Sequence, residues 1–278
     1  MKESSLQTIN DVLDKIPMGP FYYLLIVTCG ILYMSDSTEI NLFTYLTVCS
    51  GVEWNLSQNY KASISTVVLI GELLGSLFFS ALADSSGRRP SCLVGCIIMV
   101  IFSWLSGVAP NYWCLIICRF FVGFGVGVTS IPFHIVVEFM PTELRGAVLS
   151  GMRFFWTLGG VIISCVAWLT IGNGYDWRIL VYLCAIPVTI SSFLIYLYIP
   201  ESPRWLISEK KYHEAEIVLK NAAKINKTSI PNFTLMVHDN YDYHASDGDG
   251  GTDEVGYDDV EDQIQKHINL VTDLTDNT

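Results

Sequence analysis

Two apolar segments joined by a short charged hinge constrain this chain more than any other feature. The first segment ends near Ala83, and the chain then passes through Asp84, Gly87 and the pair Arg88-Arg89 before the second segment begins. A connection this short makes the two segments antiparallel neighbours. Because short loops of membrane proteins keep Lys and Arg on the cytoplasmic side, we predict a membrane hairpin whose hinge faces the cytoplasm.

The composition indicates a chain that lies in a bilayer. Hydrophobic residues make up 51% of the 278 residues and charged residues 15%, with a mean hydropathy of +0.42, which is too apolar for a water-soluble domain of this length. Of the 27 acids and 16 bases, residues 236–278 hold twelve acids and only Lys266 as a base. The remaining chain is neutral, so it offers no basic surface for nucleic acid.

Apolar segments of about 20 residues, long enough to cross the hydrocarbon core, occur six times. The predicted spans are 21–46, 62–83, 91–108, 113–137, 147–171 and 179–199. We therefore predict an all-α, six-span membrane domain over 20–199. A cytoplasmic segment with a short surface helix over 1–19 precedes it, and a cytoplasmic helical segment over 200–235 and an acidic disordered tail over 236–278 follow it.

Lys and Arg distribute unevenly between the loops on the two sides of the predicted spans. The inner loops and early tail contain Arg88, Arg89, Arg145, Arg204, Lys210, Lys211, Lys220, Lys224 and Lys227. The outer loops contain only Lys61 and Arg178. This imbalance predicts that both termini are cytoplasmic, as an even number of spans requires. The sequon at Asn55 then lies on the lumenal or external side, and we expect Asn55 to be glycosylated.

Ionisable side chains lie inside the predicted spans at Asp36, Glu39, Glu72, Arg119 and Arg153. Each ionised group near the bilayer centre costs on the order of 2.5–3.5 kcal/mol on insertion scales. Such groups pair, lose their charge or face water, so two interpretations stay open. They are ion pairs that serve packing only, or they surround a polar cavity that binds a charged solute or a proton. We select Asp36, Glu39, Glu72 and Arg119 as candidate substrate-binding or ion-binding residues.

Four motifs in order resemble the major facilitator superfamily, over residues 7–225. Residues 84–89 resemble its loop between spans two and three, and Arg119 with Gly123, Gly125 and Gly127 resembles its fourth-span motif. Residues 138–146 and 200–206 resemble the sugar-porter and organic-ion branches. Residues 34–39, with 52–54 after them, resemble the synaptic vesicle glycoprotein group, although Glu72 and Arg153 depart from that group's pattern.

This resemblance implies a carrier with twelve spans in two halves, of which this chain is similar to the N-terminal half. The expected partners are the lipid bilayer, a small organic ion or sugar-like solute with proton or cation coupling, and a second six-span half from the same protein or another copy. A vesicle or plasma membrane is the expected location. The resemblance also implies a conformational latch on the inner face, formed by Asp84, Arg88, Arg89, Glu138, Arg145, Glu201 and Arg204.

Two other classes of function, an interaction protein and an enzyme, fit the sequence less well than a carrier does. A non-transporting vesicle-membrane or regulatory interaction protein would use the acidic tail, with Tyr241, Tyr243 and Tyr257, as a docking segment. An enzyme is not expected, because no nucleophile and base can be assembled and the glycines of span four follow no strand. We expect no catalytic residue, no cofactor and no metal site.

Overall fold

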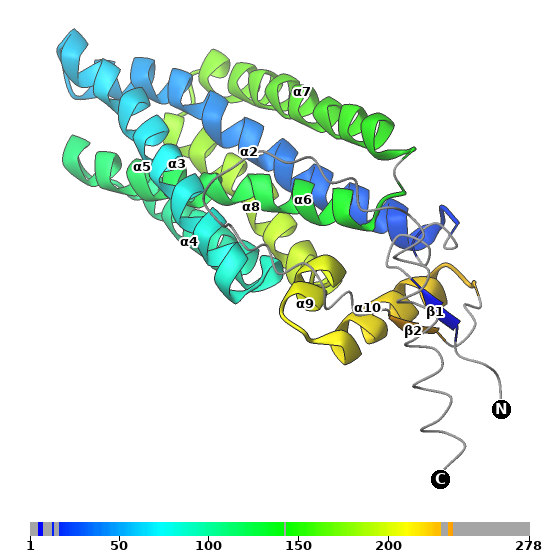
Figure 1. The fold of residues 1–278 in the computed structure, drawn as a ribbon. Helices are drawn as coiled ribbons and strands as arrows, with labels where there is room; N and C mark the ends of the chain where they lie inside the picture. The colour runs from blue at the N-terminus through cyan, green and yellow to red at the C-terminus, as the bar shows by residue number, and fades with distance from the viewer. Residues whose placement is uncertain (1–4, 8–12, 14–16, 142, 229–232, 236–278) are drawn as a thin grey trace, which may run out of the picture. The chain divides into compact units, whose positions relative to one another are not determined.

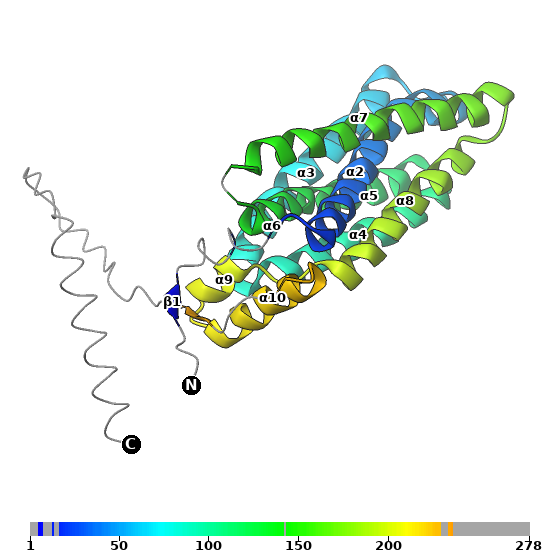
Figure 2. The same ribbon diagram turned by 90° about the vertical axis from the view of Figure 1, so that its right-hand side faces the viewer.

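The computed structural model is a bundle of long helices, with α9 and α10 at one end (Figures 1 and 2). It describes residues 5–7, 13, 17–141, 143–228 and 233–235. The helices are α2 (Pro20–Glu53), α3 (Gln58–Ser86), α4 (Arg88–Gly107), α5 (Tyr112–Val126), η1 (Gly127–Thr129), α6 (Ser130–Phe139), α7 (Arg145–Thr170), η2 (Ile171–Asn173), α8 (Trp177–Tyr198), α9 (Pro203–Ser208) and α10 (Tyr212–Ile225). Strands β1 (Ser5–Gln7) and β2 (Phe233–Leu235) pair in parallel.

Short polar side chains begin several of these helices. Asn111 Oδ1 accepts a hydrogen bond from the backbone N–H of Cys114 at 3.0 Å, where α5 begins. Asp176 and Ser202 accept backbone N–H groups in the same way at the starts of α8 and α9. Such caps satisfy N–H groups that have no partner within the helix, and they fix where each apolar segment starts.

Five helical segments have the length and composition of a membrane span, and α2 is not among them. They are Gln58–Ser86, Arg88–Gly107, Tyr112–Phe139, Arg145–Asn173 and Trp177–Tyr198. The predicted first span, 21–46, lies within α2, whose polar residues 35–39 interrupt its apolar sequence. All five of those residues are buried, and α2 packs against α3, α7 and α8. The polar centre of α2 therefore faces protein instead of lipid.

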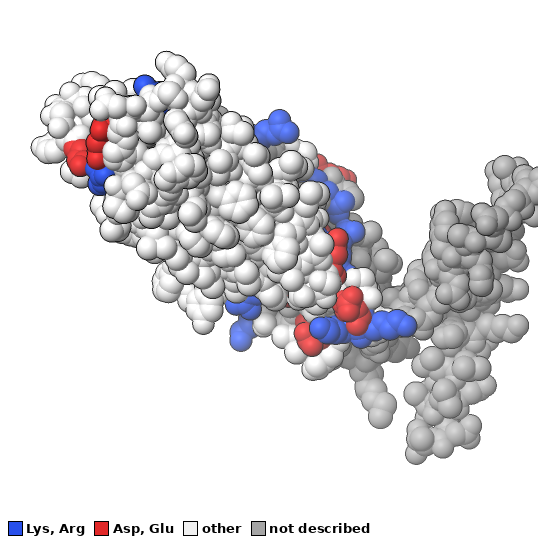
Figure 3. Space-filling view, turned by 90° about the vertical axis from the view of Figure 1, so that its left-hand side faces the viewer, with Lys and Arg blue, Asp and Glu red and all other residues white. Residues whose placement is uncertain are grey.

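Charged side chains gather toward the two ends of the bundle. Figure 3 shows a largely white body between them, with most of the blue and red atoms near the ends. Arg88, Arg145 and Arg204 are inner-loop residues of the prediction, and Arg178 lies at the opposite end of α8 from α9. The apolar middle is consistent with a bilayer around the helices.

The predicted fourth span, 113–137, lies within the helical segment Tyr112–Phe139, which is not α-helical throughout. It is broken into α5 and α6 by the short 3₁₀ segment η1. Pro132 explains the break, because it has no N–H to donate to the carbonyl of Val128 and its ring crowds that carbonyl. The break places Thr129 in the middle of the bundle, beside α2.

Glycines let α3 and α5 pack backbone against backbone. A Cβ at Gly123 would overlap the carbonyl oxygen of Val68 on α3, and one at Gly75 would overlap that of Phe124 on α5. Gly125 faces the other way, where a Cβ would lie 2.8 Å from the Cβ of Met99 on α4. The predicted close approach along the glycines of span four therefore occurs, and it serves two neighbouring helices.

At the end of the bundle that carries α9 and α10, side-chain hydrogen bonds tie the end of α10 to the start of α2. Asn226 Oδ1 accepts the backbone N–H of Phe21 at 2.8 Å, and Asn226 Nδ2 donates to the carbonyl of Pro17 at 3.0 Å. The surface helix predicted over 1–19 is wrong for Ser5–Gln7, which form β1 by pairing with β2. Most of that segment, and the predicted disordered tail over 236–278, lie outside the described residues.

We expect Gly123→Ala to lower the thermal stability of the protein, because the added methyl group meets a backbone carbonyl that no side-chain rotation can move. Overpacking of this kind costs about 1–3 kcal/mol. Gly146→Ala on α7 is the matched control, since a Cβ there has no atom within 4 Å. The melting temperature of each purified variant is measured by heating samples and then determining the folded fraction by size-exclusion chromatography. Equal melting temperatures for the two variants would contradict the predicted helix contact.

Candidate functional site

A buried ion pair joins α2 to α5 at the polar centre of α2. Arg119 Nη1 lies 2.8 Å from Glu39 Oε2, and both side chains are about 1% exposed. Ser103 on α4 donates to Glu39 Oε1 at 2.8 Å, and Arg119 Nη2 donates to Ser106. Two of the four candidate residues are thus brought together, with both carboxylate oxygens of Glu39 occupied. Such bonding is what allows a charge pair to remain buried.

Removing one partner of this pair should leave an uncompensated charge in the bundle. We expect Glu39→Gln and Arg119→Gln each to lower the free energy of unfolding by about 3–5 kcal/mol. The double variant should lose less than the sum of the two single losses, because neither charge is then left alone. Thermal melting of all four proteins tests this coupling, and additive losses would show that the pair does not act as a unit.

Asp36 lies one helical turn before Glu39 and has a different environment. Its side chain is almost fully buried, and its Oδ2 lies 3.1 Å from the hydroxyl of Thr129 in η1. Within the described part of the chain, Asp36 Oδ1 is buried without a hydrogen-bond partner. Among the described residues, no Lys or Arg pairs with Asp36 within 4 Å, whereas Glu39, on the same helix, pairs with Arg119.

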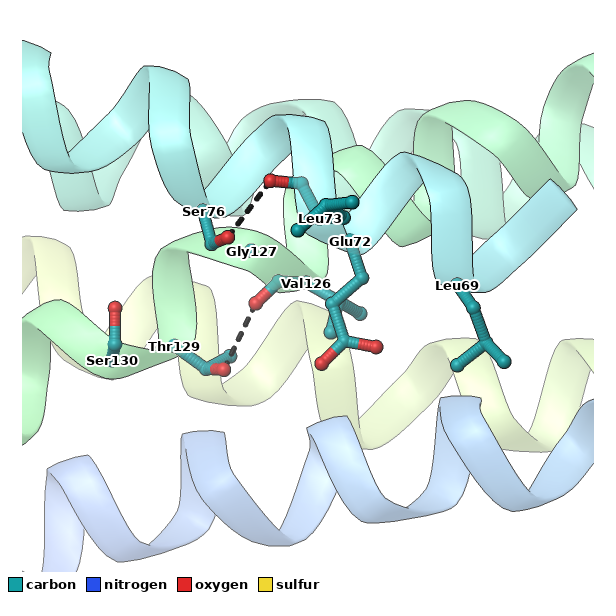
Figure 4. A pocket seen from close by; sticks show the side chains of 8 residues that line it. All are labelled: Leu69, Glu72, Leu73, Ser76, Val126, Gly127, Thr129 and Ser130. Atoms are coloured by element: carbon teal, nitrogen blue, oxygen red, sulfur yellow. Dashed lines mark hydrogen bonds between the residues drawn. The ribbon is translucent and has the colours of Figure 1, made fainter. Parts of the chain in front are cut away.

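Glu72 lines a pocket of about 310 Å³ between α3 and η1. The lining residues are Leu69, Glu72, Leu73, Ser76, Val126, Gly127, Thr129 and Ser130. Figure 4 shows the carboxylate of Glu72 and the hydroxyl of Thr129 projecting from α3 and η1 to the side where the α2 ribbon runs. The half-buried Glu72 is the fourth candidate residue, and it lies in a different place from the Glu39–Arg119 pair.

A second pocket, of about 480 Å³, lies between α2 and α7. Ser37 and Asn41 come from α2, and Trp156, Thr157, Gly160, Val161, Ser164 and Cys165 come from α7. The ring of Trp156 also lies 4.8 Å from that of Tyr33. Hydroxyl, amide and aromatic groups thus share one pocket, which suits a small polar solute. The sequence reasoning did not select these residues.

Four of the seven predicted latch residues meet where α4 begins, but only part of the contact is side chain to side chain. They are Asp84, Arg88, Glu138 and Glu201. Arg88 Nη2 lies 3.4 Å from Glu138 and 3.8 Å from Asp84. Glu201 instead accepts the backbone N–H groups of Arg88 at 2.8 Å and Arg89 at 3.1 Å. A carboxylate at the start of a helix is stabilised by those N–H groups and by the helix dipole.

The remaining predicted latch arginines bind elsewhere. Arg89 Nη2 donates to the carbonyl of Tyr196 at 3.0 Å, and Arg145 Nε donates to that of Met140 at 3.0 Å. Arg204 is close enough to Arg145 that burial and this like charge lower its pKa. Arg89 and Arg145 therefore bind backbone carbonyls at the C-terminal ends of α8 and α6.

The ion pair of Arg88 with Glu138 should stabilise the protein more than its ion pair with Asp84. The side chain of Glu138 is 14% exposed, whereas that of Asp84 is 72% exposed and farther from Arg88, and exposed pairs contribute little. We expect Glu138→Gln to lower the melting temperature and Asp84→Asn to leave it near that of the wild type. A larger effect of Asp84→Asn in the same melting assay would reverse this order.

Asn55 lies between α2 and α3, and its side chain is exposed. Its φ of 50° lies in the left-handed region that asparagine tolerates. The sequon is thus sterically open to modification, and its glycosylation stays a prediction.

The model of the sugar (and other) transporter family matches residues 22–242. The chain belongs to this family. Organic cation/carnitine transporter 7 of Arabidopsis thaliana is 30% identical over 224 residues, which are 81% of this chain and 44% of that protein. Synaptic vesicle glycoprotein 2C of Mus musculus is 29% identical over 233 residues, which are 79% of this chain and 32% of that protein. This sugar transporter family member therefore spans less than half the length of these curated relatives.

Solved structures of major facilitator proteins have the same fold. The partially occluded, inward-open xylose transporter XylE from E. coli matches with a TM-score of 0.63 and 22% sequence identity, over 74% of this chain and 56% of that one. At this identity the match shows the fold alone. The predicted superfamily and the predicted helical membrane fold are both confirmed, and this member of the sugar transporter family is a multi-pass membrane protein.

Proposed function

We propose that this chain forms one wall of a solute pathway in a transporter that works by alternating access, in which two six-span halves rock around a central site. The second half is its own C-terminal half or another copy. Both termini lie in the cytoplasm, and a vesicle or plasma membrane holds the protein. The solute is a small organic ion or a sugar-like molecule, with coupling to a proton or cation.

One observation carries this proposal, namely the buried polar centre of α2 between two pockets. The Glu39–Arg119 pair alone would be consistent with packing. Packing does not explain Asp36 and Glu72, which have no cation beside them within 4 Å among the described residues. Groups of this kind are tolerated in a membrane when they line a water-filled cavity. The name of the Arabidopsis relative, an organic cation/carnitine transporter, supports a carrier of small solutes.

Water access to the α2–α7 pocket tests the proposal. A cysteine fits at Gly160, because the nearest atoms to a Cβ there lie 3.8 Å away. In cell membranes that contain the full protein, a charged, membrane-impermeant methanethiosulfonate should modify Gly160→Cys, since thiolates form in water and not in lipid. Mass spectrometry of the modified peptide separates this site from the native cysteines.

Phe193→Cys on α8 is the matched control, because Phe193 is 60% exposed on an apolar span and should face lipid. We expect modification at position 160 to be about tenfold faster or more than at position 193. Equally slow modification at both positions would show that no wet pathway exists. That result would favour the alternative of a non-transporting interaction protein.

A further inference from the structure

The pocket beside η1 contains negative charge that the described residues do not neutralise. Glu72 forms no ion pair or hydrogen bond within the described part of the chain, and Asp36 contacts only the neutral hydroxyl of Thr129. Thr129 links the two carboxyl groups, because it donates to Asp36 and lines the same pocket as Glu72. A cation in the pocket would favour the ionised form of both carboxyl groups, and their two negative charges would in turn attract it.

The cations on the neighbouring helices are engaged or directed elsewhere. Arg119 is bound to Glu39 at 2.8 Å. Arg153 lies exposed on α7, and it makes no ion pair within 4 Å with any residue that the structure describes. Neither arginine therefore pairs with Asp36 or Glu72, and the pocket is open to a cation from outside these helices.

The walls of the pocket favour an organic ion over a metal ion. Leu69, Leu73 and Val126 supply apolar surface, and Ser76 and Thr129 supply hydroxyl groups. The volume of about 310 Å³ lies at the low end of small-molecule pockets, far above the size of a bare ion. Among the described residues, no group of three or more His, Cys, Asp and Glu side chains could hold a metal.

We propose that this pocket binds an organic cation that carries an ammonium group, with Glu72 as its counter-charge. Asp36, behind Thr129, adds a second negative charge, and the three apolar side chains contact the carbon atoms of the ligand. This inference rests on the proposed transport function and names the class of solute. It also separates Glu72, which holds the ligand, from Glu39, which holds the bundle together.

Choline and its neutral isostere, 3,3-dimethyl-1-butanol, test the proposal, because they differ in charge and hardly in shape. Isothermal titration of the purified full chain in nanodiscs measures both. We expect choline to bind about tenfold tighter or more than the isostere, since only choline is attracted by the carboxylate. This comparison uses the unaltered protein, so it does not depend on the folding of a variant.

Variants then locate the charge that matters. Glu72→Gln should weaken choline binding about tenfold or more, and Glu72→Asp should keep most of it. The control is Glu209→Gln, an exposed carboxylate at the end of α9, which should bind choline like the wild type. Equal binding of choline and the isostere, absence of choline binding, or unchanged binding by a folded Glu72→Gln protein would each overturn the proposal.

This titration is separable from the test of transport. Binding to the purified protein requires neither rocking of two halves nor passage of the solute. Failure of choline to bind, with fast labelling at position 160, would reject the ammonium ligand and leave the carrier standing. Slow labelling at position 160, with choline bound, would reject the carrier and leave the site.

Discussion

The ion pair between Glu39 and Arg119 is the interaction on which the other features of this bundle depend. A helix with five consecutive polar residues cannot face lipid, so α2 must be enclosed by its neighbours. Enclosure requires that α3, α7 and α8 pack tightly around α2, and Gly159 on α7 makes this possible because its backbone lies against the carbonyl of Met34. Electrostatic pairing and close steric contact thus require each other, because the charge pair is stable only where the helices exclude lipid.

The polar residues of α2 divide into compensated and uncompensated sets on one helix. Glu39 is occupied by Arg119 and Ser103, and its geometry is closed. One turn away, Asp36 has one oxygen without a partner in the described residues, and it lies close to the pocket of Glu72. The break at η1 contributes to this difference. The hydroxyl of Thr129, in η1, donates to Asp36, whereas among the described residues Thr129 makes no hydrogen bond to Glu39.

Much of the fold follows from the sequence, because length and hydropathy define where a helix crosses a bilayer. The depth of a charged residue in the membrane does not, however, determine which other residue it pairs with. Nothing in the sequence tells that Arg119 selects Glu39 over Asp36, since both lie on the same helix within one turn. Ser103 and Ser106 are three residues apart in an apolar segment, so they share one face of a helix. This spacing could have predicted that α4 contacts a polar group at that face. Backbone binding by Glu201 leaves no trace in a sequence pattern.

The bond between Asn226 and Phe21 also bears on how the protein is made. These residues are 205 positions apart, so the ribosome completes every long helix of the bundle before the acceptor for the first one exists. During insertion, the N–H groups at the start of α2 must be satisfied by water or lipid headgroups. The end of α10 thus acts as a late closure, which fixes the start of α2 only after α10 has been synthesised.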